Sequence, residues 1–202
     1  MTMGMLAHIA TYVKELKLPN GFSVCDLGDQ FCTFNVRRLA SEFYKELGCK
    51  RYVSIDGNGR GTLTHDLNLP LSAVTASNLG QFDLVTDFGT GEHVFNQYQV
   101  WKTIHYLTKT NGYIAFDRPA QGYPEHCYYN VHMCLFNDLA AANNYEVVRL
   151  ERSNGRNGGE LIRGVFRKVN KDKFRIPQQG RYKKLLRPIT EPELYGAMAI
   201  RS

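Results

Sequence analysis

Short apolar segments with the features of strands alternate with longer segments of helical periodicity along most of this chain. The clearest strand is FDLVTDF at residues 82–88, an apolar run bounded by turn residues. The other expected strands are residues 22–27, 51–55, 62–65 and 113–116, and the expected helices are residues 5–16, 36–47, 94–107 and 130–142. This alternation is typical of a parallel, doubly wound sheet with helices on both faces.

The last two expected strands depart from that alternation. Residues 145–151 and 160–169 are joined only by a short glycine- and asparagine-rich segment, SNGRNGG. It is too short for a crossover helix, so the two strands should form an antiparallel hairpin. We therefore predict an α/β fold whose doubly wound, mostly parallel seven-stranded sheet ends in an antiparallel β-hairpin, with helices on both faces.

Basic charge is concentrated at the C-terminal end. Residues 1–150 carry 12 Lys and Arg against 14 Asp and Glu, whereas residues 151–202 carry 13 against 5. We expect residues 1–169 to form one domain and residues 170–202 to be a basic C-terminal extension. That extension is either a solvated tail or a segment that holds a phosphate-bearing or nucleic-acid partner.

Acidic residues mark the ends of the first four expected strands. Asp26 precedes Gly28 in VCDLGDQ, Asp56 ends YVSID, Asp66 lies in THDLN, and Asp87 lies in FDLVTDFG. In a doubly wound sheet the ligand lies outside the carboxyl ends of the strands, so four acids at these ends indicate a ligand site. Taken singly, each could be a turn or helix-cap residue, an alternative that is stronger for Asp66 than for Asp56.

The order of these motifs resembles that of the class I S-adenosylmethionine-dependent methyltransferases. The resemblance covers roughly residues 20–169 and includes FDLVTDFGTGEHVFN, KTNGYIAFDRP and the closing hairpin. It implies a Rossmann-like methyltransferase domain, S-adenosyl-L-methionine as cofactor, and methyl transfer by direct displacement. The acceptor is not identified by any motif, and a small polar molecule is preferred because one domain of this size has little extra surface to position a polymer.

The resemblance also implies a set of cofactor-binding residues. Asp56, followed by Gly57, would accept hydrogen bonds from the ribose hydroxyls, and Asp66 with Leu67 would receive adenine. Asp26 and Gly28 would lie beside the methionine portion. The full implied set is Asp26, Gly28, Gln30, Asp56, Gly57, Asp66, Leu67 and Asp87.

The first motif departs from the family pattern, because Gln30 and Cys32 stand where the family has glycines. Glycine suits such positions because the backbone passes close to the ligand or adopts a positive φ. Gln30 could instead make amide hydrogen bonds to the amino-acid end of the cofactor. Alternatively, both side chains could fill the pocket.

Three residues are candidates for removing a proton from the acceptor: Glu92 and His93 after the fourth strand, and His126 in the loop beyond the fifth. Histidine is the usual base near neutral pH. Glu92 and His93 could equally be a charged first turn of a helix, and His126 an ordinary surface histidine. His126, Cys127, His132 and Cys134 make a metal site conceivable, but their spacing is unlike that of soft-metal sites, and we expect no metal.

Two other functions remain open. The first is a non-catalytic module that binds an adenosine ligand or nucleic acid on a methyltransferase scaffold. The second is a nicotinamide-dependent dehydrogenase, which would need GxGxxG at the first turn. The chain has no run of about 18 apolar residues and no leader-like N-terminus, and its five cysteines lack CxxC spacing. We therefore expect a cytoplasmic protein with reduced thiols and no membrane partner.

Overall fold

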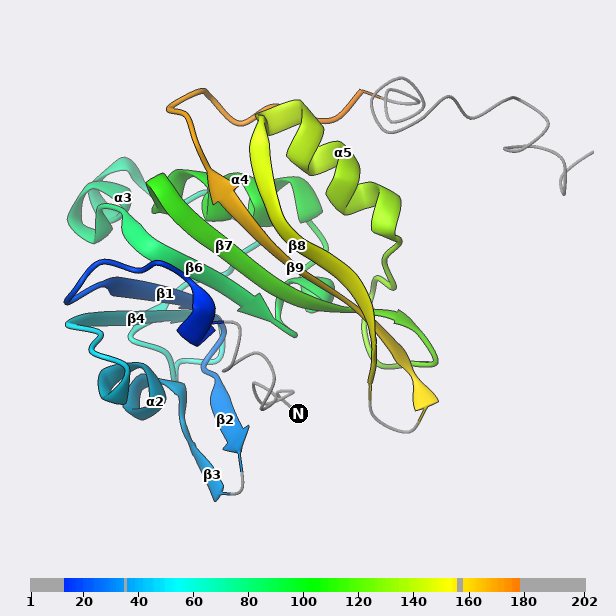
Figure 1. The fold of residues 1–202 in the computed structure, drawn as a ribbon, viewed down its shortest axis with the longest axis horizontal. Helices are drawn as coiled ribbons and strands as arrows, with labels where there is room; N and C mark the ends of the chain where they lie inside the picture. Colours follow the sequence, from blue (N-terminus) through cyan, green and yellow to red (C-terminus); the bar gives the residue numbers. More distant parts are fainter. Residues whose placement is uncertain (1–12, 35, 156–157, 179–202) are drawn as a thin grey trace, which may run out of the picture.

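A seven-stranded sheet lies at the centre of the protein (Figure 1). The structure, a computed structural model, describes residues 13–34, 36–155 and 158–178. Its strand order is β5-β4-β1-β6-β7-β9-β8. The strands are β1 Ser23–Leu27, β4 Arg51–Asp56, β5 Leu63–Thr64, β6 Phe82–Phe88, β7 Thr108–Gln121, β8 Tyr145–Asn154 and β9 Glu160–Lys168. The first five pair in parallel, whereas β9 pairs antiparallel with both β7 and β8. The predicted fold class is confirmed, including the closing hairpin.

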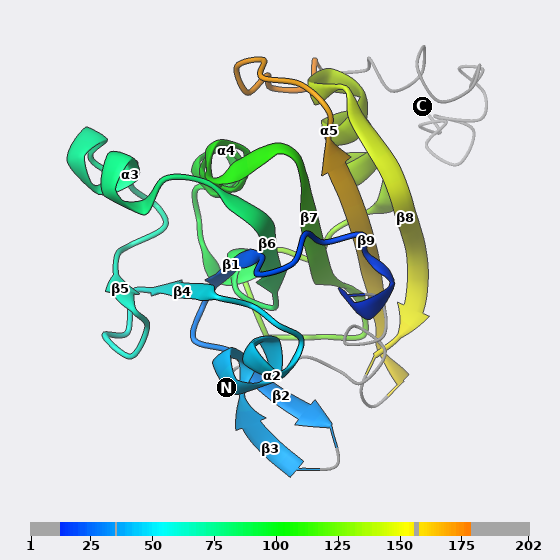
Figure 2. The same ribbon diagram turned by 60° about the vertical axis from the view of Figure 1, so that its left-hand side comes forward.

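Helices cover both faces of the sheet. In Figure 2, α2 Ala40–Glu46 lies below β4 and β1, and α4 Gln97–Leu107 lies above them. On the α4 face, Trp101 packs edge-on against Phe136 of α5 Met133–Asn143, with ring centroids 5.9 Å apart. The α2 face has its own buried cluster, which includes Val13 and Phe43. Of the helix expected over residues 5–16, residues 13–15 are helical and residues 5–12 lie outside the described residues.

The predicted helix over residues 36–47 is wrong in its first part. A small hairpin of β2 Phe31–Phe34 and β3 Val36–Leu39 precedes α2 and projects from the sheet in Figure 1. Val36 and Leu39 fit a helical period with the apolar residues that follow, but they also fit a short strand, which aromatic and β-branched residues favour. The Ala40 amide donates to the Gln30 carbonyl at 3.0 Å, which closes the base of this hairpin.

The other boundaries differ less from expectation. β7 is much longer than residues 113–116, and α5 begins at Met133 rather than near residue 130. α4 begins at Gln97, where the Asn96 side chain accepts from the Gln99 amide at 3.1 Å, and a short 3-10 turn, η1 Gly91–His93, precedes it. α3 Ala73–Leu79 was not predicted. No helix of the described residues is long and apolar enough to span a membrane.

Residues 170–178, the start of the predicted basic extension, lie against the domain. The His105 imidazole donates through Nε2 to the Asp172 carbonyl at 2.8 Å and accepts from the Tyr145 hydroxyl at Nδ1 at 2.6 Å. Burial lowers the pKa of His105 to about 4, in agreement with a neutral ring. Residues 179–202, which carry much of the basic charge, lie outside the described residues.

Candidate functional site

The loops that follow β1 and β4 meet at the carboxyl edge of the sheet. The Gly28 amide donates to the Ile55 carbonyl at 2.8 Å, and Gly28 has a φ of 88°, which favours glycine. The next amide, of Asp29, donates to Asp56 Oδ2 at 2.8 Å. The predicted ribose-binding carboxylate is thus in direct contact with the first motif, although 27 residues separate them in the chain.

Gln30 occupies the space beside Gly28. Its side chain is 1% exposed, and Nε2 donates to the Leu27 carbonyl at 3.1 Å and to Thr90 Oγ1 at 2.9 Å. A Cβ on Gly28 would lie 2.7 Å from that nitrogen. The other amide atom, Oε1, is buried and has no hydrogen-bond partner among the described residues. Gln30 therefore bridges the loops after β1 and β6 and presents an unsatisfied acceptor between them.

Asp26 points into the protein rather than out of the strand end. Its carboxylate is fully buried and accepts from the Tyr52 hydroxyl at 2.8 Å and from the Thr86 hydroxyl. Burial raises the pKa of Asp26 to about 7, and these hydrogen bonds act against the rise. The side chain is held by neighbouring strands, so any effect of Asp26 on a ligand would be indirect.

The predicted adenine-binding residues differ in exposure. Asp66 is exposed, and its Oδ1 accepts from the Asn68 amide and side chain, both at 2.9 Å, which lowers the pKa of Asp66. Leu67 is 4% exposed and belongs to the core beneath α4. Asn68 Oδ1 in turn accepts from the Asn96 amide at 2.9 Å, so the loops after β5 and β6 are linked. Gly57 begins the loop after β4.

Asp87 forms a buried ion pair that the sequence did not reveal. Its partner is Arg118 of β7, which is 1% exposed, and the Gly91 amide also donates to Asp87 Oδ1, at 2.9 Å. Arg118 Nη1 lies 3.7 Å from Glu92 Oε2. The only local signal of this arrangement was that Arg118 follows the apolar strand residues in YIAFDRP.

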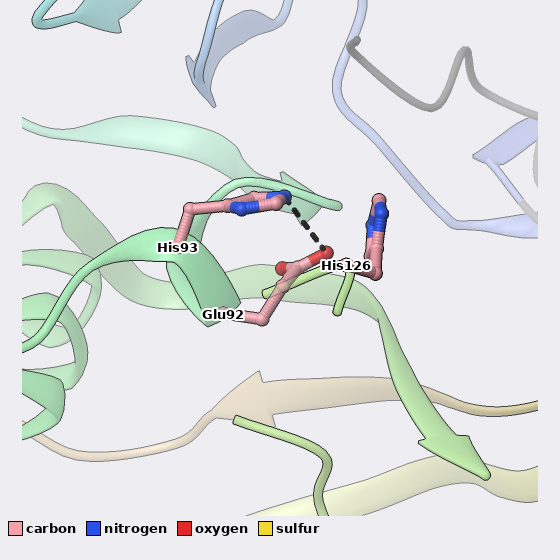
Figure 3. A group of neighbouring side chains, drawn as sticks. All are labelled: Glu92, His93 and His126. Atoms are coloured by element: carbon pink, nitrogen blue, oxygen red, sulfur yellow. Dashed lines mark ion pairs between the residues drawn. The ribbon is translucent and has the colours of Figure 1, made fainter. Parts of the chain in front are cut away.

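The three predicted catalytic residues converge, as Figure 3 shows. One ligand-type atom from each of Glu92, His93 and His126 lies within 4.8 Å of the other two. His93 Nε2 is 4.0 Å from Glu92 Oε1, and the two imidazole centroids are 4.9 Å apart. Two loops well separated in sequence therefore supply one cluster, which we call the Glu–His–His trio.

The trio is electrostatically unusual. Glu92 is fully buried, and neither of its carboxylate oxygens has a hydrogen-bond partner among the described residues; the same holds for His126 Nε2. Burial raises the pKa of Glu92 to about 7, and Arg118 acts against the rise. Burial, with the neighbouring His126, lowers the pKa of His93. Perturbed groups of this kind are concentrated at functional sites.

Exposed aromatic rings flank the trio. Phe95 and Tyr128 are 71% and 69% exposed, and their ring centroids are 6.2 Å apart. The Tyr128 amide donates to the Glu92 carbonyl at 3.2 Å, so this pair is fixed directly beside the trio. Large exposed aromatics at one edge of a sheet offer an apolar surface to a ligand.

The cysteines do not join this cluster. Within the described residues, the trio is the only group of three or more His, Cys, Asp or Glu side chains with the spacing of a metal site. Cys127 Sγ contacts the Tyr129 carbonyl at 3.3 Å, and Cys134 is exposed on α5.

A cavity of about 470 Å³ lies at the opposite, amino edge of the sheet, where Asp83, Tyr113 and Arg167 line it.

Comparisons with known proteins agree on the fold alone. No family model matches the sequence, and no curated protein matches it. Among solved structures, the 1,6-didemethyltoxoflavin-N1-methyltransferase of Burkholderia thailandensis, bound to 1,6-didemethyltoxoflavin and S-adenosylhomocysteine, has a TM-score of 0.58 and 15% identity over 80% of this chain and 77% of that chain. The N-methyltransferase NodS of Bradyrhizobium japonicum WM9, with S-adenosylhomocysteine, has the same score and identity over 81% and 87%.

One further similar structure is not named as a methyltransferase. The [4+2]-cyclase SpnF matches with a TM-score of 0.55 and 11% identity, over 80% of each chain. At these identities the likeness establishes the fold, which is that of the class I S-adenosylmethionine-dependent methyltransferases, with the closing hairpin in place. A fold does not determine the reaction, which depends on the residues of the site.

Proposed function

We propose that this chain, which has the fold of the class I S-adenosylmethionine-dependent methyltransferases, transfers a methyl group from S-adenosylmethionine to a small polar acceptor. The observation that carries the proposal is the contact between Asp56 Oδ2 and the Asp29 amide at 2.8 Å. It joins the loop of the first motif to the acid that ends the second parallel strand. A doubly wound sheet binds its ligand at this edge.

The residues at this edge fit the cofactor. Each oxygen of Asp56 accepts one internal hydrogen bond, from Asp29 and from Asn58, so each keeps a lone pair for a ribose hydroxyl. Gln30 Oε1 is a buried acceptor without a partner among the described residues, which suits the ammonium group of the methionine portion. Asp66 and the loop that it begins would hold the adenine end.

The acceptor would lie against the Glu–His–His trio. When bound, S-adenosylmethionine supplies a methyl group whose bond to sulfur breaks, its electron pair leaving with the sulfur, as a lone pair of the acceptor forms the new bond. The protein's share is to position the acceptor and to take its proton. Phe95 and Tyr128 provide an exposed surface on which an acceptor ring could stack. A small ligand of this kind is bound by the didemethyltoxoflavin methyltransferase.

Replacing Gln30 by Ala decides between the two interpretations of the first motif. If the amide serves the cofactor, Gln30→Ala should weaken binding of S-adenosylhomocysteine by about tenfold, the effect of roughly one lost hydrogen bond. Isothermal titration calorimetry measures this affinity directly. Tighter binding in Gln30→Ala would instead show that the side chain fills the pocket.

Replacing His126 by Ala tests the acceptor side. We expect turnover to fall by about 10²–10⁴-fold, the range typical of a lost general base, with unchanged affinity for S-adenosylhomocysteine. Turnover is measured once an acceptor has been found by screening small polar aromatic compounds. Normal turnover of His126→Ala with that acceptor would remove His126 from the proposed mechanism.

The non-catalytic binding module is the second candidate, because the Gln30 side chain lies between the end of β1 and the loop after β6, where it donates to the Leu27 carbonyl and to Thr90 Oγ1. It predicts salt-dependent binding of nucleic acid together with no affinity for either adenosyl compound. The basic residues that would carry such binding lie mostly outside the described residues.

A further inference from the structure

We propose that the Glu–His–His trio binds one divalent transition-metal ion. Two imidazoles and one carboxylate form a ligand set that suits iron, zinc, manganese or cobalt and leaves positions open for an exogenous ligand. The inferred role of the ion is to polarise the acceptor and so promote loss of its proton, in place of direct proton transfer to His126, whose lone pair the ion would occupy. That role rests on the proposed methyl transfer, whereas the metal-binding site itself does not depend on it.

The geometry allows coordination with a small adjustment. The three ligand atoms lie within 4.8 Å of one another. An ion held at about 2.0–2.2 Å from each would draw them to roughly 3–3.5 Å apart. The side chain of His93 is 42% exposed, so it can close this difference by rotation, while Glu92 stays fixed in the interior.

The buried carboxylate supplies an independent reason to expect a cation. Glu92 is fully buried without a hydrogen bond to either oxygen in the described part of the chain, an arrangement that is costly for an ionised group. Its two oxygens have different neighbours: Oε2 lies 3.7 Å from Arg118 Nη1, whereas Oε1 is the one near His93 Nε2, at 4.0 Å. A metal ion between Oε1 and the two imidazoles would satisfy the unpaired side of the group.

Arg118 supplies only part of this cation. Its single guanidinium is shared between two acids, because Nη2 pairs with Asp87 and Nη1 lies 3.7 Å from Glu92 Oε2, so the buried set of Asp87, Glu92 and Arg118 retains one net negative charge when both acids are ionised. His126 Nε2 also has no hydrogen-bond partner among the described residues, and in the tautomer in which this nitrogen carries the lone pair it can bind a metal ion. The backbone around the trio is fixed by the hydrogen bond from the Tyr128 amide to the Glu92 carbonyl.

Cobalt(II) is the probe of choice, because its absorption spectrum reports the donor atoms. The full chain is treated with a chelator, freed of the chelator, and titrated with Co²⁺ while its visible spectrum is recorded. We expect one ion per chain, ligand-field bands, and no thiolate-to-cobalt charge-transfer band. His93→Gln and His126→Gln should each weaken binding by more than the roughly 10–100-fold typical of losing an outer-shell partner.

His132→Gln is the matched control. His132 is an exposed histidine in the same region, at the start of α5 and outside the trio, so this variant should bind Co²⁺ as the unmodified chain does. Circular dichroism confirms that each variant is folded. The absence of Co²⁺ binding, a thiolate band, or equal affinity in the unmodified chain and both trio variants would overturn the proposal.

Titration of the same preparations with S-adenosylhomocysteine separates this inference from the proposed function. If the chain binds S-adenosylhomocysteine but does not bind Co²⁺, the metal site is overturned and the proposed methyl transfer stands. If it binds Co²⁺ at the trio but does not bind S-adenosylhomocysteine, the metal site is supported and its role in methyl transfer is overturned. Binding of both supports the full proposal.

Discussion

Replacing Asp56 by Ala should lower the affinity for S-adenosylhomocysteine by about a hundredfold or more, because two hydrogen bonds from ribose hydroxyls to a charged group would be lost. The carboxylate is suited to this task, since each oxygen has one internal donor, from Asp29 or Asn58, and a free lone pair. Calorimetric titration of the folded variant gives the affinity. The melting temperature without ligand shows whether the domain is intact.

Asp83→Ala is the matched control for Asp56→Ala. The Asp83 carboxylate also accepts from a backbone amide, that of Ser23 at 2.8 Å, but it lies at the amino edge of the sheet. The Asp83→Ala variant should be less stable than the unmodified chain, but its affinity for S-adenosylhomocysteine should be unchanged. Unchanged affinity in Asp56→Ala would show that Asp56 is not a ligand-binding residue.

Replacing Arg118 by Met should cost about 3–5 kcal/mol of unfolding free energy, because it leaves a buried carboxylate without its partner. Arg118 and Asp87 are 1% and 0% exposed, and Glu92 beside them is equally buried. Urea denaturation of the ligand-free protein measures the loss. The double variant Arg118→Met with Asp87→Asn should lose less than the single variant, since it removes one uncompensated charge.

An exposed ion pair of the same chain provides the comparison. Arg152 lies 3.0 Å from Glu160 on the closing hairpin, with the side chains 57% and 38% exposed. Arg152→Met should cost only about 0–1 kcal/mol. If Arg118→Met were no more destabilising than Arg152→Met, the buried pair would not contribute to the fold as described.

The sheet was predictable because its signals are local. Apolar runs such as residues 82–88 mark central strands, and the short segment between β8 and β9 excludes a crossover. The β2–β3 hairpin was missed because Val36, Leu39 and Ala40 fit a helical period as well as a strand followed by a helix. Periodicity alone does not separate these alternatives over so few residues.

The sequence indicated candidate site residues but not the contacts between them. Glu92, His93 and His126 were chosen because their loops follow strand ends, yet only the fold reveals that the three side chains converge. Arg118 was missed because its partner, Asp87, lies 31 residues away on a neighbouring strand. Likewise, nothing local indicates that the Gln30 amide reaches Thr90 across the sheet edge.

Titration of the purified full chain with S-adenosylmethionine and S-adenosylhomocysteine, with NAD as the control ligand, tests the central claim most directly. The account predicts micromolar binding of both adenosyl compounds at one site per chain, no binding of NAD, and a melting temperature that rises with adenosyl ligand concentration. Absence of binding by a chain that is demonstrably folded would contradict the account and would mean that Gln30 and its neighbours have closed the site.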